Sequence, residues 1–295
     1  MYKIHSVSLM NLRKISELLK AGLKDHYPDR EIESMTRLIY AHMFGFKPIQ
    51  VYENLNMPIG KKHEKHIHNI LEALVQYQPI QYILGETEFY GCSIKVGKGV
   101  LIPRPETEEL ADWIIQSIPA GSYHILDICT GSGCLIIALS KYYEGSISYA
   151  TDQSETALRY ARENATKNTL KVQYMEHDIL NSKIPLASGT MDIIVSNPPY
   201  ITEKEKDLML PNVLDWEPAE ALFAPEHEPL LFYHSIIPES RRLLKPGGVL
   251  FMEINESFGT EVTTLLRNQG FTNVELRKDL SGKSRMVKGG RSRSS

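Results

Sequence analysis

The stretch His124-Ile125-Leu126-Asp127-Ile128-Cys129-Thr130-Gly131-Ser132-Gly133 decides how this sequence folds. A short apolar run leads into a turn with two glycines, and a helix is expected to begin near Leu135. Strand, glycine turn and helix in this order predict a nucleotide-type pocket at the carboxyl end of a parallel strand. Gly131 and Gly133 allow a positive φ and a close approach of a ligand to the backbone, while Asp127 can anchor a cationic amino group or the turn itself.

A second apolar run, from Ile147 to Ala150, ends in Thr151 and Asp152, about 20 residues beyond the glycine turn. An acid at this place can bind the hydroxyl groups of a ribose. A lone Asp152 is more often a helix N-cap, but Ser154 can cap the following helix, Leu158 to Asn164, equally well. Two signals in register therefore favour a nucleotide-type pocket more strongly than the glycine turn does alone.

Two more strands are predicted, and each leads to residues that can contact a ligand. Val172 to Met175 precedes Asp178 and Ile179, which can accept a hydrogen bond from an adenine amine and cover its ring. A solvated turn acid is an equally good interpretation of Asp178 taken singly. Met191 to Val195 is nearly all apolar, as expected of a strand buried on both faces. We therefore expect four strand ends to supply one crevice.

The fourth of these strands runs into Asn197-Pro198-Pro199-Tyr200. Two prolines remove two backbone donors and stop strand pairing. Asn197 then offers an amide oxygen, the backbone of Asn197 and Pro198 offers carbonyls, and Tyr200 offers a flat ring with a polar tip. These groups suit a planar NH2 that is held by its hydrogens. A proline-rich strand exit without chemistry is the alternative, and the register with the other strand ends favours the ligand site.

The N-terminal part of the chain is predicted to be helical. Apolar residues recur at steps of three and four within residues 7–24, 29–45 and 67–75, which indicates three amphipathic helices in a bundle that ends near residue 78. Such a bundle is more often a docking or lid module than a catalytic one. His63, His66 and His68 suggest a metal site, but their Lys-rich surroundings without an acid or cysteine pattern favour a solvated helix face.

The segment after Pro79 links this bundle to the strands described above. Alternating apolar residues and glycines, with Tyr82, Ile83 and Leu84 among them, predict a β-hairpin. It ends in Leu101-Ile102-Pro103-Arg104-Pro105-Glu106-Thr107-Glu108, where Thr107 or the preceding turn can start a helix. Arg104 and Glu106 can simply pair and cap this helix, or the segment can border the pocket.

Composition and charge exclude several classes of protein. The chain of 295 residues has a net charge of −3 and 42% hydrophobic residues, which is ordinary for a soluble protein and gives no global basic field for nucleic acid or membrane. No apolar stretch approaches the length of a membrane span, and no signal peptide is recognised. Three cysteines without metal-site spacing fit free thiols in a reducing compartment. We expect a cytoplasmic protein.

The sequence resembles the HemK/PrmC family in four places taken together: the Ile102-to-Glu108 segment, Asp127 to Gly133, Asp152, and Asn197-Pro198-Pro199-Tyr200-Ile201. Members use S-adenosyl-L-methionine to methylate the side-chain amide N5 of the glutamine in the Gly-Gly-Gln motif of peptide chain release factors. The resemblance implies an α/β fold with a Rossmann-like seven-stranded methyltransferase domain, its last strand antiparallel. The implied domains are residues 1–78, a helical substrate-docking bundle; 79–100, a β-hairpin linker; 101–289, the methyltransferase domain; and 290–295, a disordered tail.

The resemblance also assigns roles to individual residues. The expected cofactor-binding residues are Asp127, Cys129, Thr130, Gly131, Ser132, Gly133, Asp152, Asp178, Ile179 and Asn197. The glutamine is expected to bind at Asn197, Pro198, Pro199 and Tyr200, with Asn197, Pro198 and Tyr200 catalytic and no metal involved. The family usually has glycine where this chain has Cys129, and a side chain there narrows the turn.

Three alternatives remain open at this point. The acceptor can be the glutamine of a ribosomal protein, which the motif does not distinguish from a release factor. Asn-Pro-Pro-Tyr is also found in adenine-N6 methyltransferases of nucleic acid, which need a basic groove and a base-flipping platform that this composition does not indicate. A binding protein without turnover, or an NAD-binding Rossmann domain, is disfavoured by the intact motif at the fourth strand.

Overall fold

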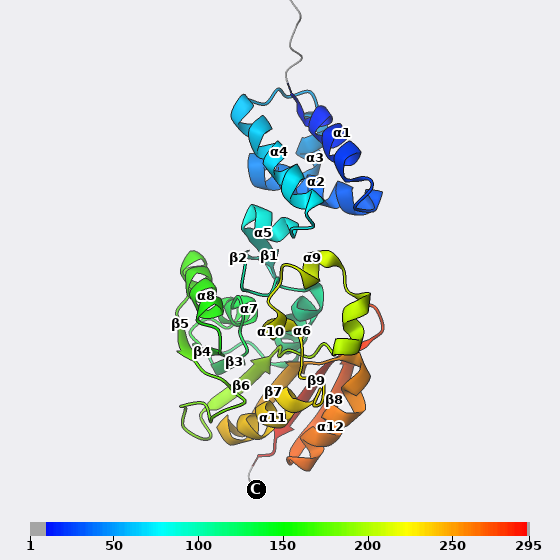
Figure 1. The fold of residues 1–295 in the computed structure, drawn as a ribbon. Helices are drawn as coiled ribbons and strands as arrows, with labels where there is room; N and C mark the ends of the chain where they lie inside the picture. Colours follow the sequence, from blue (N-terminus) through cyan, green and yellow to red (C-terminus); the bar gives the residue numbers. More distant parts are fainter. Residues whose placement is uncertain (1–9, 294–295) are drawn as a thin grey trace, which may run out of the picture. The chain divides into compact units, whose positions relative to one another are not determined.

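The computed structural model describes residues 10–293 and divides into two compact units, Met1–Gly85 and Glu86–Ser295 (Figure 1). The first unit is helical. Its helices are α1 (Leu12–Leu23), α2 (Asp29–Phe44), α3 (Pro48–Glu53), α4 (Lys61–Val75) and α5 (Ile80–Leu84). Asn11 caps α1 by accepting a hydrogen bond from the Lys14 backbone N–H, and the apolar stripe of α1 is fully buried. None of the helices within residues 10–293 has the length and apolarity needed to cross a membrane.

The three predicted helices of this unit are present, although residues 7–9 of the first lie outside the described residues. Helix α4 begins six residues before the predicted stripe because its first turns are polar and exposed, so they carry no apolar signal. His63, His66 and His68 are exposed on these turns, as predicted. The interpretation of residues 82–84 as part of a hairpin was wrong. Pro79 precedes a short helix there, and Gly85 ends it at a φ of 79°.

The second unit is built on a seven-stranded sheet, as the fold prediction required. A short antiparallel hairpin, β1 (Glu86–Phe89) and β2 (Cys92–Lys95), precedes it. The sheet strands are β3 (His124–Ile128), β4 (Ile147–Asp152), β5 (Val172–Glu176), β6 (Met191–Ser196), β7 (Leu244–Glu253), β8 (Phe271–Lys278) and β9 (Ser284–Arg291). Their order is β5-β4-β3-β6-β7-β9-β8, and β9 runs antiparallel to the other six strands.

Helices cover both faces of this sheet (Figure 1). Helices α11 (Leu231–Leu243) and α12 (Gly259–Asn268) share one buried apolar cluster with Leu126, Ile194 and Leu250. The other face carries α6 (Pro105–Ser117), α7 (Cys134–Tyr142) and α8 (Glu155–Lys167), and Trp113 of α6 packs edge-to-face on Phe251. Because side chains alternate along a strand, the central strands are apolar on both faces.

The last strand corrects the prediction of a disordered tail from residue 290. Gly290 and Arg291 continue β9, and Arg291 donates a hydrogen bond to the Leu244 carbonyl. Glycine composition suggested disorder, but Gly289 is needed here because a Cβ at this position would lie 3.1 Å from Cβ of Phe271. Residues 294 and 295 lie outside the described part of the chain.

The glycine turn joins β3 to α7. The backbone N–H of Thr130 donates to the Thr151 carbonyl at 2.9 Å, which ties the turn to β4. Gly131 and Gly133 have φ values of 54° and 78°, a region that only glycine occupies without strain. A Cβ on Gly133 would lie 3.0 Å from Cβ of Ala161 on α8, whereas a Cβ on Gly131 would meet nothing within 4 Å.

This difference makes the two glycines a matched pair for a stability test. Gly133→Ala is expected to destabilise the protein by about 2 kcal/mol or more, because a left-handed alanine costs about 1–2 kcal/mol and overpacking against α8 typically adds about 1–3 kcal/mol. Gly131→Ala should cost only the backbone part, about 1 kcal/mol. Urea unfolding of both variants measures the difference, and equal losses would contradict the close-packing argument.

Candidate active site

The four predicted strand ends do meet at one edge of the sheet. Parallel register places Ile128 beside Thr151 on β4 and beside Ser196 on β6, and Asp152 lies beside Glu176 on β5. The polar residues that follow these positions therefore surround a common space. Three hollows open there.

Each hollow is defined by its lining. The first hollow, about 640 Å³ with its open mouth, is lined among others by Cys129, Gly131, Asp152, Asp178, Ile179, Asn197 and Pro199. The second, about 380 Å³, is lined by Asp127, Cys129, Thr130, Gly131, Ser132 and Asn197 together with residues of the Leu101-to-Thr107 segment. The third, about 320 Å³, is lined by Asn197, Pro198 and Tyr200 with Arg104 and Leu222. Asn197 and Leu101 line all three, so the hollows adjoin. Gly133 lines none of them and serves as the N-cap position of α7.

Asp152 is held by the backbone on both sides of its carboxylate. Its Oδ2 accepts from the Gly131 N–H at 2.8 Å, and its Oδ1 accepts from the Ser154 N–H at 2.9 Å. Burial nevertheless raises the pKa of Asp152. Ser154 is the N-cap of α8, as predicted, and accepts from the Ala157 N–H. Asp152 thus fixes the glycine turn and also faces the first hollow.

Asp127 is almost fully buried at the floor of the second hollow. Burial raises its pKa from 3.8 to about 7, although Thr130 Oγ1 donates to Asp127 Oδ2 at 2.6 Å. Cys129 sits beside it with a positive φ of 62°. Burial, together with the neighbouring acids, raises the pKa of the Cys129 thiol well above its ordinary value, so the thiol stays protonated. Cys129 lines the first and second hollows.

Asp178 and Ile179 form one wall of the first hollow. Asp178 Oδ1 accepts from the Leu180 N–H at 2.8 Å, and Asp178 Oδ2 accepts from the Asn181 side chain. The carboxylate therefore organises its own turn and also lines the hollow, and its bond to an adenine amine stays a prediction. Ile179 is buried and belongs to the apolar cluster under α11.

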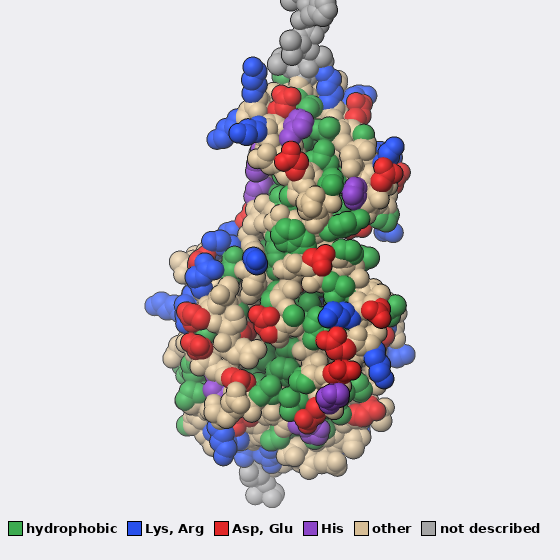
Figure 2. All heavy atoms as spheres, viewed as in Figure 1, with side chains coloured by type: hydrophobic (Ala, Val, Ile, Leu, Met, Phe, Trp, Pro, Cys, Tyr) green, Lys and Arg blue, Asp and Glu red, His purple; other side chains and the backbone are tan. Residues whose placement is uncertain are grey.

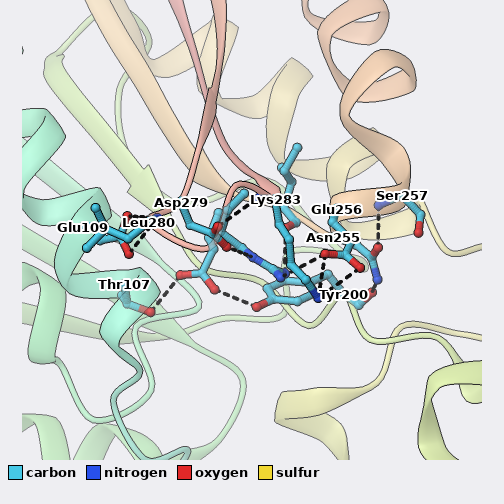
Figure 3. A network of polar contacts seen from close by, with 12 residues as sticks. Thr107, Glu109, Tyr200, Asn255, Glu256, Ser257, Asp279, Leu280 and Lys283 are labelled. Atoms are coloured by element: carbon cyan, nitrogen blue, oxygen red, sulfur yellow. Dashed lines mark hydrogen bonds and ion pairs between the residues drawn. The ribbon is translucent and has the colours of Figure 1, made fainter. Parts of the chain in front are cut away.

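Strand β6 ends at Ser196, directly before Asn197, as predicted from the two prolines. The Asn197 Nδ2 donates to Thr107 Oγ1 at 3.0 Å, and Thr107 Oγ1 donates to Glu253 Oε2 at 2.7 Å. The Tyr200 hydroxyl donates to Glu253 Oε1 at 2.6 Å. The dashed lines at Thr107 and Tyr200 in Figure 3 mark the two bonds that end on this carboxylate. Burial, followed by the charge of Glu253, raises the pKa of Tyr200 well above its ordinary value.

The 201–226 segment contributes lining to the first and third hollows. It contains η1 (Glu203–Leu208), α9 (Pro211–Leu214) and α10 (Ala219–Leu222), and Ala221 of α10 lines both the first and the third hollow. Glu217 accepts from Arg104 Nη2 at 2.6 Å and from the Ile102 N–H at 3.0 Å. Of the two interpretations of the Leu101-to-Glu108 segment, the pairing of Arg104 with Glu106 is not observed, because the buried Glu217 carboxylate accepts from both Arg104 and the Ile102 N–H. The segment borders the hollows, as the other interpretation predicted.

The helix starts in the turn that precedes Thr107, which is one of the two starts expected from the sequence. Helix α6 begins at Pro105, and Arg104 precedes it without a side-chain cap, so the Thr107 hydroxyl is free to bond Glu253. Sequence reasoning missed Glu253, although an acid at the end of a buried strand is the same signal that identified Asp152. It also missed Val100 and Phe232 as lining of the first hollow, and no local pattern marks them.

Comparisons with known proteins agree with this geometry. Residues 108–222 match the family model described as Methyltransferase small domain, and residues 15–85 match PrmC N-terminal domain. A release factor glutamine methyltransferase from Bacteroides thetaiotaomicron is 39% identical over 276 residues, covering 94% of this chain and 99% of that protein. One from Flavobacterium psychrophilum is 38% identical, covering 90% and 94%.

A solved structure supports the fold alone. A methyltransferase from Pyrococcus furiosus superposes with a TM-score of 0.51 at 16% identity, covering 79% of this chain and 100% of that chain. The predicted Rossmann-like methyltransferase fold is confirmed by this likeness together with the sheet order.

The raised pKa of Asp127 has a measurable effect on stability. Because its pKa of about 7 in the folded protein lies above the ordinary 3.8, the stability it contributes is fully present below pH 3.8 and is lost as the pH rises through 7. Asp127→Asn does not titrate, so its melting temperature relative to the wild type should be higher at pH 8 than at pH 5. Thermal unfolding of both ligand-free proteins measures this, and a difference that does not change with pH would contradict the buried-acid assignment.

Proposed function

This chain belongs to the release factor glutamine methyltransferase family, and from that membership we propose that it methylates the side-chain amide N5 of a release factor glutamine. The methyl donor is S-adenosylmethionine. The observation that carries the proposal is the position of Asn197, which lines the third hollow with Pro198 and Tyr200 and also opens on the other two. A donor and an acceptor held in these hollows would meet at this residue.

The residues of the first and second hollows suit the donor. Asp152 at the end of β4 can hold the ribose, and Ile179 with Val100 and Phe232 supplies an apolar slot for the adenine ring. Asp127 can offer its carboxylate to the amino group. When bound, the donor supplies a sulfonium-activated methyl group, and the electron pair of the broken S–C bond remains on sulfur.

The residues of the third hollow suit a primary amide. A carboxamide nitrogen is a poor nucleophile because its lone pair is delocalised into the carbonyl. The Asn197 Nδ2 is engaged by Thr107, so Asn197 Oδ1 is free to accept one substrate N–H, and the Pro198 carbonyl can accept the other. Such positioning can contribute on the order of 7–11 kcal/mol, and the two oxygens stabilise positive charge that develops on nitrogen.

The proton released after methylation needs no dedicated base. A methylated, positively charged amide is strongly acidic and loses its proton to water. Tyr200 is unsuited to accept it, because its raised pKa and its bond to Glu253 keep it a neutral donor. We assign Tyr200 to packing on the amide plane.

The nucleic-acid alternative has less support. An adenine-N6 methyltransferase needs a basic groove for the phosphate backbone. On the face drawn in Figure 2, basic side chains are interspersed with acidic ones, and no continuous basic band crosses the described atoms of that face. A protein substrate also gives a role to the Met1–Gly85 unit, which we propose helps to dock the release factor in the cytoplasm.

A substrate panel tests this proposal directly. The wild-type protein is incubated with tritium-labelled S-adenosylmethionine and, in parallel, a release factor, the same factor with its Gly-Gly-Gln glutamine replaced by alanine, ribosomal proteins and adenine-containing DNA. Label is expected in the intact release factor only. Label in DNA alone would overturn the proposal, and label in ribosomal protein alone would move it to the alternative acceptor.

The two proposed acceptors of the substrate NH2, Asn197 Oδ1 and the Pro198 carbonyl, predict a selective kinetic defect. Asn197→Ala should lower kcat by about 10²–10³-fold, which is the effect of removing one donor or acceptor that meets developing charge. Donor binding, measured by calorimetry, should remain detectable because Asp152 and Ile179 are untouched. Near-normal turnover by Asn197→Ala would exclude the proposed role.

The ribose assignment of Asp152 needs a test that separates it from the anchoring of the glycine turn. Asp152→Ala disturbs both, so binding of S-adenosylhomocysteine and of its 2′-deoxy analogue is compared in wild type and variant. The wild type should prefer the ribose form, and Asp152→Ala should bind both forms weakly and equally. An unchanged preference in the variant would place the ribose elsewhere.

A further inference from the structure

Glu253 is the meeting point of two hydrogen bonds, one from Thr107, which lines the second hollow, and one from Tyr200, which lines the third. It ends strand β7 and is fully buried, yet it is a charged residue. Its two oxygens accept from Thr107 on α6 and from Tyr200 after β6. An isolated buried carboxylate is costly, so a carboxylate in this place requires a specific reason.

The pKa of Glu253 is raised overall, and three neighbouring groups oppose that rise and support the carboxylate form. Burial raises the pKa of Glu253, while the hydroxyls of Tyr200 and Thr107 and the charge of Arg285 lower it. Arg285 lies on β9, and its Cζ lies over the Tyr200 ring, 5.7 Å from the ring centroid. As a carboxylate, Glu253 has acceptors only, so both hydroxyl protons must point towards it.

The direction of these protons determines how Asn197 is oriented. Since the Thr107 proton is committed to Glu253, the Thr107 oxygen can only accept from its other neighbour. Asn197 must therefore turn its NH2 towards Thr107 and its oxygen away. The opposite rotamer of the amide would place two acceptors against each other.

From this geometry we propose that Glu253 is a positioning residue for the methyl transfer, which fixes the Asn197 amide through Thr107 so that Asn197 Oδ1 faces the substrate NH2. The inference rests on the proposed function, because it concerns the orientation of the Asn197 amide that is proposed to hold the substrate NH2. Glu253 does not touch the substrate.

An isosteric change of Glu253 to glutamine can reverse the direction of the hydrogen bonds that join it through Thr107 to Asn197. In the first possible arrangement the glutamine oxygen faces Thr107, and the Tyr200 hydroxyl then loses the acceptor that Glu253 gave it. In the second, the glutamine NH2 faces Thr107, and every group is satisfied if the Thr107 hydroxyl then donates to Asn197. In the second arrangement Asn197 turns its oxygen to Thr107 and its NH2 to the hollow. Two NH2 groups then face each other, and the acceptor is no longer held.

The experiment compares Glu253→Gln with a matched buried carboxylate outside the site. Glu239 on α11 is also buried and accepts from the Ile184 N–H and from Arg242, so Glu239→Gln controls for the loss of a buried charge. We expect Glu253→Gln to lower kcat by on the order of 10²-fold with an unchanged Kd for S-adenosylmethionine. Glu239→Gln should keep the wild-type kcat whatever its melting temperature.

A double variant tests whether Glu253 acts through Thr107. Thr107→Val removes the hydroxyl that would turn Asn197 in Glu253→Gln, so the double variant should be no slower than Thr107→Val alone. Losses of kcat are non-additive when the two residues act through one series of hydrogen bonds, whereas the losses from two independent structural defects multiply. Multiplied losses of kcat, or a wild-type kcat in Glu253→Gln, would overturn the inference.

A measurement without turnover separates this inference from the proposed function. Nuclear Overhauser contacts between the Asn197 side-chain NH2 and Thr107 should be present in the wild type and absent in Glu253→Gln. If the wild type methylates no release factor, the proposed function fails, while these contacts still decide the orientation of Asn197. Contacts that persist in Glu253→Gln would overturn the inference.

Discussion

Parallel strand register is the constraint on which the site depends. Because β3, β4, β5 and β6 pair in the same direction with their ends level, four segments far apart in the chain deliver their polar residues to one edge. Helices cover both sheet faces, and the polar residues of the candidate site gather at this edge. The glycine turn joins β3 to α7 without placing side chains of Gly131 and Gly133 in the pocket. The two prolines end β6 directly before Asn197.

The site holds several buried acids, and their burial opposes stability. Burial raises the pKa of Asp127, of Asp152 and of Glu253 alike. Each is partly compensated by hydrogen bonds from the backbone or from hydroxyls. Acids that remain under-compensated in the free protein are suited to bind cationic or hydroxyl groups when a ligand arrives. Burial of these acids thus opposes stability at the edge that carries the candidate site, as expected for a functional site.

Much of this arrangement could be predicted from the sequence, and the limits have a physical cause. Strand ends, glycine turn and Asn197 to Tyr200 carry local signals of turn chemistry and apolar runs, and the sheet with these ends at one edge was predicted from them. The pairs Thr107 with Glu253 and Arg104 with Glu217 are 146 and 113 residues apart, so no local pattern connects them. The predictions for residues 80–84 and 290–291 were wrong for another reason. Residues 80–84 form a helix despite a composition typical of hairpins, and residues 290–291 pair with β8 despite a composition typical of disorder.

The position of β9 has a consequence for the order in which the chain can assemble during synthesis. β9 is made after β8 but lies between β7 and β8, so the sheet cannot close until residues 284–291 are available. Its Met286 pairs with Glu253, and its Arg285 lies over Tyr200. A ribosome-bound chain that ends before β9 would therefore already contain the Asn197 segment but lack one side of its support. The proposed acceptor site therefore gains this support only after β9 has been synthesised.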